Sequence, residues 1–253
     1  MRFPTKFAMG LVALLGATSA ANAAIINPGF ENGTTSSWTT IGDVVVTPST
    51  NVLTFNGINW TVNAFETQMA QLNPGNANVS TIETALGLTL GTLQNPNANG
   101  GVFTDASAIY QTFAANAGDT ISAWWNYVAT DYIPFNDPAF VIVKDPNGAF
   151  FVDTLASIHG AGIAVGTAGN TGWHLFSQTA LLTGDYTLAF VTTNDKDQIL
   201  DSVLFVDNGE GTCEPACVPL PDPGTEVPEP ATLSLLGLGV AGLVAARRRR
   251  KSA

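Results

Sequence analysis

The second half of the chain is a series of short segments rich in β-branched and aromatic residues, and this series constrains the fold more than any other feature. Turn pairs such as Gly118-Asp119, Asn147-Gly148 and Gly184-Asp185 separate the segments. Short apolar segments between turn signals are typical of β-strands. The pattern predicts strands over residues 110–113, 120–129, 139–144, 150–154, 173–180, 186–193 and 202–206.

Apolar side chains alternate within the predicted strands. One face of segment 120–129 carries Ile121, Ala123, Trp125 and Tyr127, and one face of segment 186–193 carries Tyr186, Leu188, Phe190 and Thr192. A period of two residues places such side chains on one side of a sheet. Seven or more short strands with little helix predict an all-β fold, an antiparallel jelly-roll-like β-sandwich.

Residues 48–101 depart from this pattern. Asn and Gly are frequent there, and pairs such as Asn56-Gly57 and Pro74-Gly75 mark loops. The run Ser80-Thr81-Ile82-Glu83 fits a capping box, which predicts one short helix over residues 81–86 that ends near Gly87. We therefore expect an insertion packed on the sandwich, which either carries specificity or covers one edge of the core.

The N-terminal segment 1–23 has the pattern of a secretory signal peptide. Arg2 and Lys6 form a basic region, residues 7–17 are apolar, and Ala21-Asn22-Ala23 fits a cleavage site. The sequence thus predicts a signal helix, a β-sandwich domain over residues 24–208 and a linker rich in proline and acidic residues over 209–226.

The linker contains both cysteines of the chain, Cys213 and Cys217. In an exported protein this pair predicts a local disulfide. A metal pair is the less favoured alternative, because no His or further Cys lies nearby. The closed loop is short, so the bond would stiffen the linker and would not stabilise a core.

Charge is distributed very unevenly. Of the 9 Lys and Arg residues, only Lys144 and Lys196 lie between residues 24 and 230, which also hold all 20 acidic residues, so this part carries 2 − 20 = −18. Such a charge repels nucleic acid, and we expect no nucleic-acid partner. It suits cation binding and solubility within a polysaccharide matrix.

The C-terminal segment 227–251 has three parts. Val227, Pro228, Glu229 and Pro230 come first, the uncharged apolar run 231–246 follows, and five basic residues end the segment, namely Arg247, Arg248, Arg249, Arg250 and Lys251. The 16-residue run would span about 24 Å as a helix at roughly 1.5 Å per residue, slightly less than a bilayer core. The basic cluster predicts a membrane stop on the cytoplasmic side of a transmembrane helix.

In this order, the three parts resemble the PEP-CTERM sorting signal of Gram-negative bacteria. The resemblance implies an inner-membrane intermediate, which an exosortase, a membrane protease-transferase, processes on the way to the cell surface or extracellular matrix. It also implies a setting of exopolysaccharide and biofilm production. An ordinary C-terminal membrane anchor is the alternative, although such an anchor has no need of Pro228-Glu229-Pro230.

The start of the body resembles another family. Ile25-Ile26-Asn27-Pro28-Gly29-Phe30-Glu31-Asn32-Gly33, followed by Trp38, is similar to the first strand and turn of galactose-binding-like jelly rolls, the sandwich of many carbohydrate-binding modules. That resemblance implies a structural Ca²⁺ held by Glu31 and Asp207, where the first and last strands meet. Both residues being ordinary acids at strand ends is the alternative.

An acidic loop between two predicted strands combines groups that suit sugars. Asp131, Asn136 and Asp137 provide carboxylate and carboxamide groups, which hydrogen-bond hydroxyls, and Tyr132 and Phe135 provide rings that stack on sugar faces. We expect the loop to be exposed and to contact a sugar or a metal. Ordering of the loop by its own Asx turns would require the same residues.

Catalysis has little support in the sequence. Neither His159 nor His174 lies in a nucleophile or zinc motif, and no dinucleotide-binding motif precedes a helix. We therefore predict a protein without enzymatic activity that is structural or associates with carbohydrate in an extracellular matrix. The alternatives are a secreted carbohydrate-active hydrolase and an adhesin without a defined small ligand.

Overall fold

A computed structural model describes residues 21–93 and 103–208. Most of the predicted signal helix, the linker with its predicted Cys213–Cys217 disulfide, and the segment 227–251 with its predicted transmembrane helix lie outside these residues. No helix within them is long and apolar enough to cross a membrane. The elements in chain order are β1 Thr39–Ile41, β2 Asp43–Phe55, β3 Ile58–Asn73, α1 Val79–Leu86, β4 Phe103–Ala115, β5 Thr120–Val128, β6 Ala139–Lys144, β7 Phe150–Ser157, β8 Ile163–Ala164, β9 Asn170–Thr179, β10 Gly184–Asp195 and β11 Val203–Asp207.

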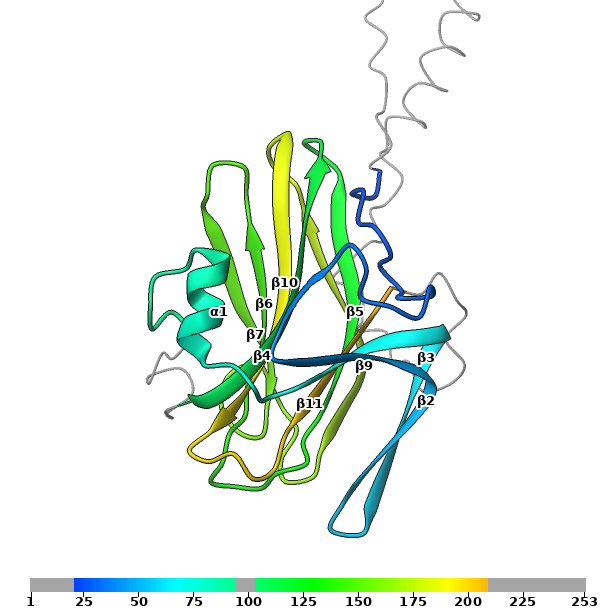
Figure 1. Ribbon diagram of the computed structural model, residues 1–253, viewed down its shortest axis with the longest axis vertical. Coiled ribbons are helices and arrows are strands. Elements are labelled where there is room, and N and C mark those ends of the chain that lie inside the picture. Colours follow the sequence, from blue (N-terminus) through cyan, green and yellow to red (C-terminus); the bar gives the residue numbers. More distant parts are fainter. Residues whose placement is uncertain (1–20, 94–102, 209–253) are drawn as a thin grey trace, which may run out of the picture. The chain divides into compact units, whose positions relative to one another are not determined.

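The strands form two sheets (Figure 1). The first has the order β1-β4-β10-β6-β7-β8 and the second the order β2-β3-β11-β5-β9. Every pairing of these strands is antiparallel except that of β7 with β8. The prediction of an all-β fold with two sheets and one short helix is confirmed.

The main core lies between the facing sides of the two sheets. In β5 it takes the predicted face, Ile121, Ala123, Trp125 and Tyr127, and in β10 it takes Tyr186, Leu188 and Phe190. All seven predicted strands are present, and β6 has the predicted bounds. Strands β4 and β10 extend further than predicted, because small and polar residues such as Ala106 and its partner Thr193 continue the ladder that joins them.

The prediction of an insertion over residues 48–101 is wrong for the residues that form β2 and β3. β2 continues to Phe55, and Asn56 and Gly57, with φ angles of 48° and 78°, turn the chain directly into β3. This two-residue turn with positive φ at both positions matches the right-handed twist of a hairpin. β3 then pairs with β11, so the hairpin is an integral part of the second sheet.

The predicted helix is present, but its predicted capping box is wrong. α1 begins after Asn78, whose side chain makes no capping hydrogen bond, and ends at Gly87 with φ of 78°, as expected. The Glu83 carboxylate instead accepts hydrogen bonds from the backbone N–H groups of Gly91 and Leu93, both at 2.8 Å. Glu83 is therefore buried and anchors the chain that follows the helix.

Different elements cover the outer faces of the two sheets, as Figure 1 shows for α1 and the hairpin. α1 packs Val79, Ile82 and Leu86 on small residues of the first sheet, including Ala108 and Ala189. The curved hairpin packs on the second sheet, where the Phe65 ring lies 5.1 Å from the rings of both Trp124 and Trp173. Trp124 is therefore covered by protein on this face.

The first strand implied over residues 25–33 is not formed. These residues make turns, and Asn27 and Phe30 have φ angles of 52° and 60°. The carboxamide of Gln111 takes the place of a neighbouring strand, because it accepts a hydrogen bond from the Ile26 N–H at 2.7 Å and donates one to the Ile26 carbonyl at 2.9 Å. Phe30 and Trp38 still enter the core, with ring centroids 5.5 Å apart.

Candidate functional site

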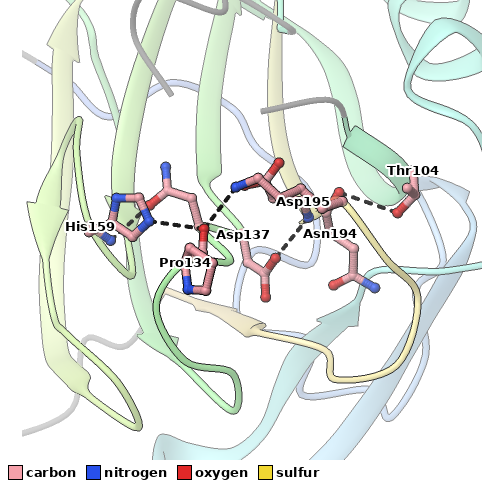
Figure 2. Close-up of polar contacts among 8 residues, drawn as sticks. Thr104, Pro134, Asp137, His159, Asn194 and Asp195 are labelled. Atoms are coloured by element: carbon pink, nitrogen blue, oxygen red, sulfur yellow. Dashed lines mark hydrogen bonds and ion pairs between the residues drawn. The ribbon is translucent and has the colours of Figure 1, made fainter. Parts of the chain in front are cut away.

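The predicted acidic loop contributes to a buried hydrogen-bond network, which we call the loop network: residues 131–137 with Asp195 and Ser202. The Asp137 carboxyl accepts hydrogen bonds from the Asp195 N–H at 2.8 Å and from the Ser202 hydroxyl at 2.9 Å. Figure 2 shows the first of these bonds beside the contacts of Pro134 and His159. Asp137 is only 1% exposed, so the expectation that its carboxyl faces solvent is wrong.

Asn136 and Asp131 are buried as well, with exposures of 0% and 2%. The Asn136 side-chain oxygen accepts a hydrogen bond from the His159 N–H at 2.8 Å, and Asp131 Oδ1 accepts one from the Tyr132 N–H at 2.7 Å. These polar groups order the loop and tie it to its neighbours. Of the five residues predicted to bind a ligand, the structure leaves Tyr132 exposed and Phe135 half-buried, their rings in an edge-on contact.

Burial disfavours the charged form of the carboxyl groups in the loop network. Burial raises the pKa of the Asp137 carboxyl to about 8, although the hydrogen bonds from Asp195 and Ser202 lower it. Burial also raises the pKa of Asp131, and the charges of Asp197 and Asp195 add to the rise. One cation relieves this charge: Lys196 Nζ lies 2.8 Å from Asp195 Oδ2 and donates to the Pro134 carbonyl.

The predicted calcium ligands Glu31 and Asp207 both lie close to Gly29, a region that we call the Gly29 corner. A Cβ atom built on Gly29 would lie 3.3 Å from Asp207 Oδ1, 3.5 Å from the Asn208 carbonyl oxygen and 3.7 Å from Glu31 Cγ. Both carboxylates are hydrogen-bonded to the backbone of β3. Asp207 accepts a hydrogen bond from the Phe65 N–H, and Glu31 accepts hydrogen bonds from the N–H groups of Thr67 and Gln68.

The chemistry of this corner fits a hard cation. Burial raises the pKa of Asp207 to about 7, and the charges of Glu31 and Glu66 contribute to the rise, so a cation would relieve repulsion there. Two carboxylates and the Asn208 carbonyl are oxygen donors of the kind calcium prefers, although it takes six to eight. Within residues 21–93 and 103–208, no three His, Cys, Asp or Glu side chains are gathered closely enough to hold a metal ion.

A third acidic region was not predicted as a site. It is an open pocket of roughly 520 Å³ between the start of β2, the loop from β3 to α1, the start of β4 and the loop from β10 to β11. We call it the polar pocket and define it by its six side chains with carboxylate or carboxamide groups, Asp43, Asn76, Asn78, Asp105, Gln198 and Asp201.

The buried hydroxyl of Ser107 holds two walls of the polar pocket together. It accepts a hydrogen bond from the Asp43 N–H at 2.7 Å and donates one to the Gly75 carbonyl at 3.2 Å. Gly42 makes this approach possible, because its φ is +80° and a Cβ there would lie 2.3 Å from the Ser107 oxygen. Only glycine fits these contacts, so the position of Asp43 depends on Gly42.

The far wall of the polar pocket is held by β10. Asn194 Nδ2 donates a hydrogen bond to Asp201 Oδ1 at 2.9 Å. Burial raises the pKa of Asp105, and the charges of Asp201 and Asp197 raise it further, whereas hydrogen bonds from Asn194 and Thr104 lower it. No local motif marks this pocket, since its residues come from four separate parts of the chain.

The comparisons with known proteins agree with the prediction for the C-terminal segment. Residues 226–250 match the model of the PEP-CTERM protein-sorting motif. The chain therefore carries this motif, which indicates export and exosortase-mediated sorting to the surface of a bacterial cell. No curated protein matches the chain.

Several solved structures are similar to this chain. One is TmCBM61 in complex with β-1,4-galactotriose, at 13% identity and a TM-score of 0.40, where the match covers 74% of this chain and 96% of the other. Another is the xylan-binding domain from CBM 22, at 13% identity and a TM-score of 0.32, with 77% and 99% covered. A third is the K1 cleaved adhesin domain of Lys-gingipain from Porphyromonas gingivalis W83, at 15% identity and a TM-score of 0.33, with 72% and 96% covered.

Proposed function

We propose that this protein is an exported, non-catalytic polysaccharide-binding component of an extracellular matrix. In this proposal an exosortase-type enzyme processes the chain at Pro228-Glu229-Pro230, after an inner-membrane stage, in a Gram-negative bacterium that produces exopolysaccharide. The β-sandwich then remains at the surface or in the biofilm matrix. The C-terminal motif supports the sorting part of this proposal, and the polar pocket supports the binding part.

The polar pocket is the observation that carries the binding function. Its volume, roughly 520 Å³, lies within the range of about 300–1,000 Å³ typical of small-ligand sites. Carboxylates and carboxamides, which line it, accept and donate the hydrogen bonds that sugar hydroxyls require. Tyr132 lies on the same side of the fold as the loop from β10 to β11, since Lys196 in that loop bonds to Pro134, and its exposed ring is a stacking surface for a sugar.

Calcium has a structural part in this proposal. Glu31 and Asp207 would hold the ion at the corner around Gly29. The ion would neutralise the repulsion between the two carboxylates and so stabilise the junction of β3 and β11. It would not take part in sugar binding, because both residues contact β3 and neither lines the polar pocket.

Binding and turnover can be measured with the same ligands. The full-length chain should be retained by immobilised polysaccharides in affinity electrophoresis, and the bound polysaccharide should keep its chain length over hours. Mass spectrometry of the exported protein should find Ala24 at its N-terminus and the C-terminal segment removed. Failure to bind any polysaccharide, with a folded protein, would contradict the binding function.

A carbohydrate hydrolase is the second candidate, and one observation favours it. Asp105 has a raised pKa and lines the same pocket as Asp201, so the two could serve as general acid and base. The release of reducing ends from a bound polysaccharide, abolished by Asp105→Asn, would replace the binding function by this one.

A further inference from the structure

The polar pocket contains uncompensated negative charge. Its carboxylates stand on three elements: Asp43 begins β2, Asp105 lies near the start of β4, and Asp201 precedes β11. In the part of the chain that the structure describes, the only lysines are Lys144 and Lys196, and neither lines the pocket. Lys144 lies over the Phe150 ring, and Lys196 is bonded to Asp195. The pocket therefore attracts a cationic ligand.

A second feature of the pocket is the neutral amide that holds one of its carboxylates from behind. The Asn194 side chain is 1% exposed, and its nitrogen is bonded to the pocket residue Asp201. Within the described residues its oxygen, Oδ1, is buried without a hydrogen-bond partner. Asn194 does not itself line the pocket, so it holds Asp201 from behind with a neutral donor and brings no positive charge to the cavity.

We propose that the polar pocket binds a protonated amino sugar, as found in a partly de-N-acetylated polysaccharide. This inference rests on the proposed binding function and adds the chemical class of the ligand. An ammonium group supplies three donors and a positive charge, and its hydrogen bonds to carboxylates are charge-assisted. The neighbouring sugar hydroxyls match the carboxamides of Asn76, Asn78 and Gln198, which line the same pocket.

Three properties of the site select this ligand class. The carboxylates are distributed over the walls of a pocket large enough for a sugar unit, which suits an organic cation with several donors. An N-acetylated sugar lacks the charge and brings an additional acceptor, so it is less favourable beside Asp105 and Asp201. Burial and the Asp201 charge raise the pKa of Asp105, which is the electrostatic environment that a positive charge relieves.

The test compares two ligands and two matched variants of the full-length chain. Isothermal titration at pH 6 in 150 mM salt measures the affinity for a β-1,4-linked glucosamine tetrasaccharide and for its N-acetylated counterpart. The pocket variant is Asp105→Asn with Asp201→Asn. The control variant is Asp153→Asn with Asp185→Asn, which removes the same charge from exposed positions in β7 and β10. Circular dichroism and the melting temperature show that each variant folds.

We expect the glucosamine tetrasaccharide to bind at least tenfold more tightly than the acetylated one. The pocket variant should lose at least tenfold in this affinity, and the control variant less than twofold. Equal loss in the two variants would mean general attraction of a cation to an acidic protein and would overturn the inference. Equal binding of the two tetrasaccharides, weakened in the pocket variant alone, would overturn the amine preference and leave the proposed function standing. Binding of no polysaccharide at all, neutral ones included, would remove both.

Discussion

The loop network and the polar pocket are built from the same residue types and use them in opposite ways. In the loop network, Asp137 is 1% exposed, and both of its carboxyl oxygens accept hydrogen bonds from protein groups. In the polar pocket, Asp43, Asp105 and Asp201 line an open cavity. Carboxylates in the loop network are therefore enclosed by protein, whereas those in the pocket border a cavity, although Asp201 also accepts a hydrogen bond from Asn194.

The carboxyl groups of the loop network and of the polar pocket differ because the backbone is placed differently around each of them. Asp137 follows the turn 132–135, and its φ of 43° brings the side chain against the backbone of β10. At the pocket, Ser107 binds the backbone at Asp43 and Gly75 and leaves the Asp43 carboxylate to the cavity. An acidic loop is therefore a weak indication of a binding site until the partners of its carboxylates are known.

The sharpest test of this comparison is Asp137→Ala. The change leaves the Asp195 N–H and the Ser202 hydroxyl without their buried partner, at a cost of about 3 kcal/mol. For a domain of this size the melting temperature should fall by about 6–12 °C in thermal unfolding followed by circular dichroism.

Asp137→Asn is the matched control for this loss. It keeps an acceptor oxygen and tolerates a positive φ, so its effect should be less than half as large. The equivalent change in the pocket, Asp105→Asn, should alter the melting temperature by less than about 2 °C. An Asp137→Ala protein as stable as the unmodified chain would show that the network does not maintain the fold.

The pH dependence of stability should follow from the same buried acids. In the folded protein the pKa of Asp137 is raised to about 8 and that of Asp207 to about 7, whereas both ionise near pH 4 in the unfolded chain. Between these values the folded state holds more protons than the unfolded state, so stability falls as pH rises. The melting temperature should be on the order of 10 °C lower at pH 8.5 than at pH 5.5 in the presence of a chelator.

One variant and one added ion separate the contributions of Asp137 and Asp207 to this pH dependence. Asp137→Asn should flatten the curve most above pH 7, because it removes the group that ionises last. Added calcium should flatten the contribution of Asp207 alone. A melting temperature that rises steadily from pH 5.5 to pH 8.5 would contradict the burial of both carboxyls in protonated form.

The sequence predicted the central strands well, because their signal is local. Alternation in β5 and β10 identified the core faces, and the pair Gly118-Asp119 marked a turn that the structure contains. The hairpin of β2 and β3 was missed, although Asn56-Gly57 between the alternating segments 51–55 and 58–62 is a strong hairpin signal. Its exposed residues include the apolar Val52 and Ile58 beside Thr and Asn, so the face that packs on the sheet was not distinct in the sequence.

The sites were less predictable than the strands, because they depend on long-range contacts. Glu31 and Asp207 were brought together by resemblance and not by spacing, and both do lie close to Gly29. The polar pocket joins residues from position 43 to position 201, and nothing local connects them. The burial of Asn136 and Asp137 depends on β10 and on the loop after β7, which no pattern within 131–137 reveals.

Added calcium should stabilise the protein through Glu31 and Asp207, and not through the loop network or the polar pocket. Glu31→Ala removes hydrogen bonds to Thr67 and Gln68, so it should destabilise the protein by about 1 kcal/mol even in a chelator. Gly29→Ala leaves the partners of those bonds in place and puts a methyl group 3.3 Å from Asp207 Oδ1 and 3.7 Å from Glu31 Cγ. We expect 2 mM calcium to raise the melting temperature of the unmodified chain by about 3 °C and to have no effect on Gly29→Ala. An equal rise in both proteins would place the ion elsewhere.

The smallest expected effect on stability comes from a change at Tyr132. This residue belongs to the loop network, and its ring is proposed to contact a sugar that the polar pocket binds. The ring is 43% exposed, so Tyr132→Ala should change the melting temperature by less than about 1 °C. An aromatic ring that stacks on a sugar contributes about 1 kcal/mol, which corresponds to about a fivefold loss of affinity for the bound polysaccharide in affinity electrophoresis. Phe151→Ala, at an equally exposed ring in β7, is the control. If Tyr132→Ala binds as tightly as that control, the sugar contacts are confined to the polar pocket and the loop network is structural throughout.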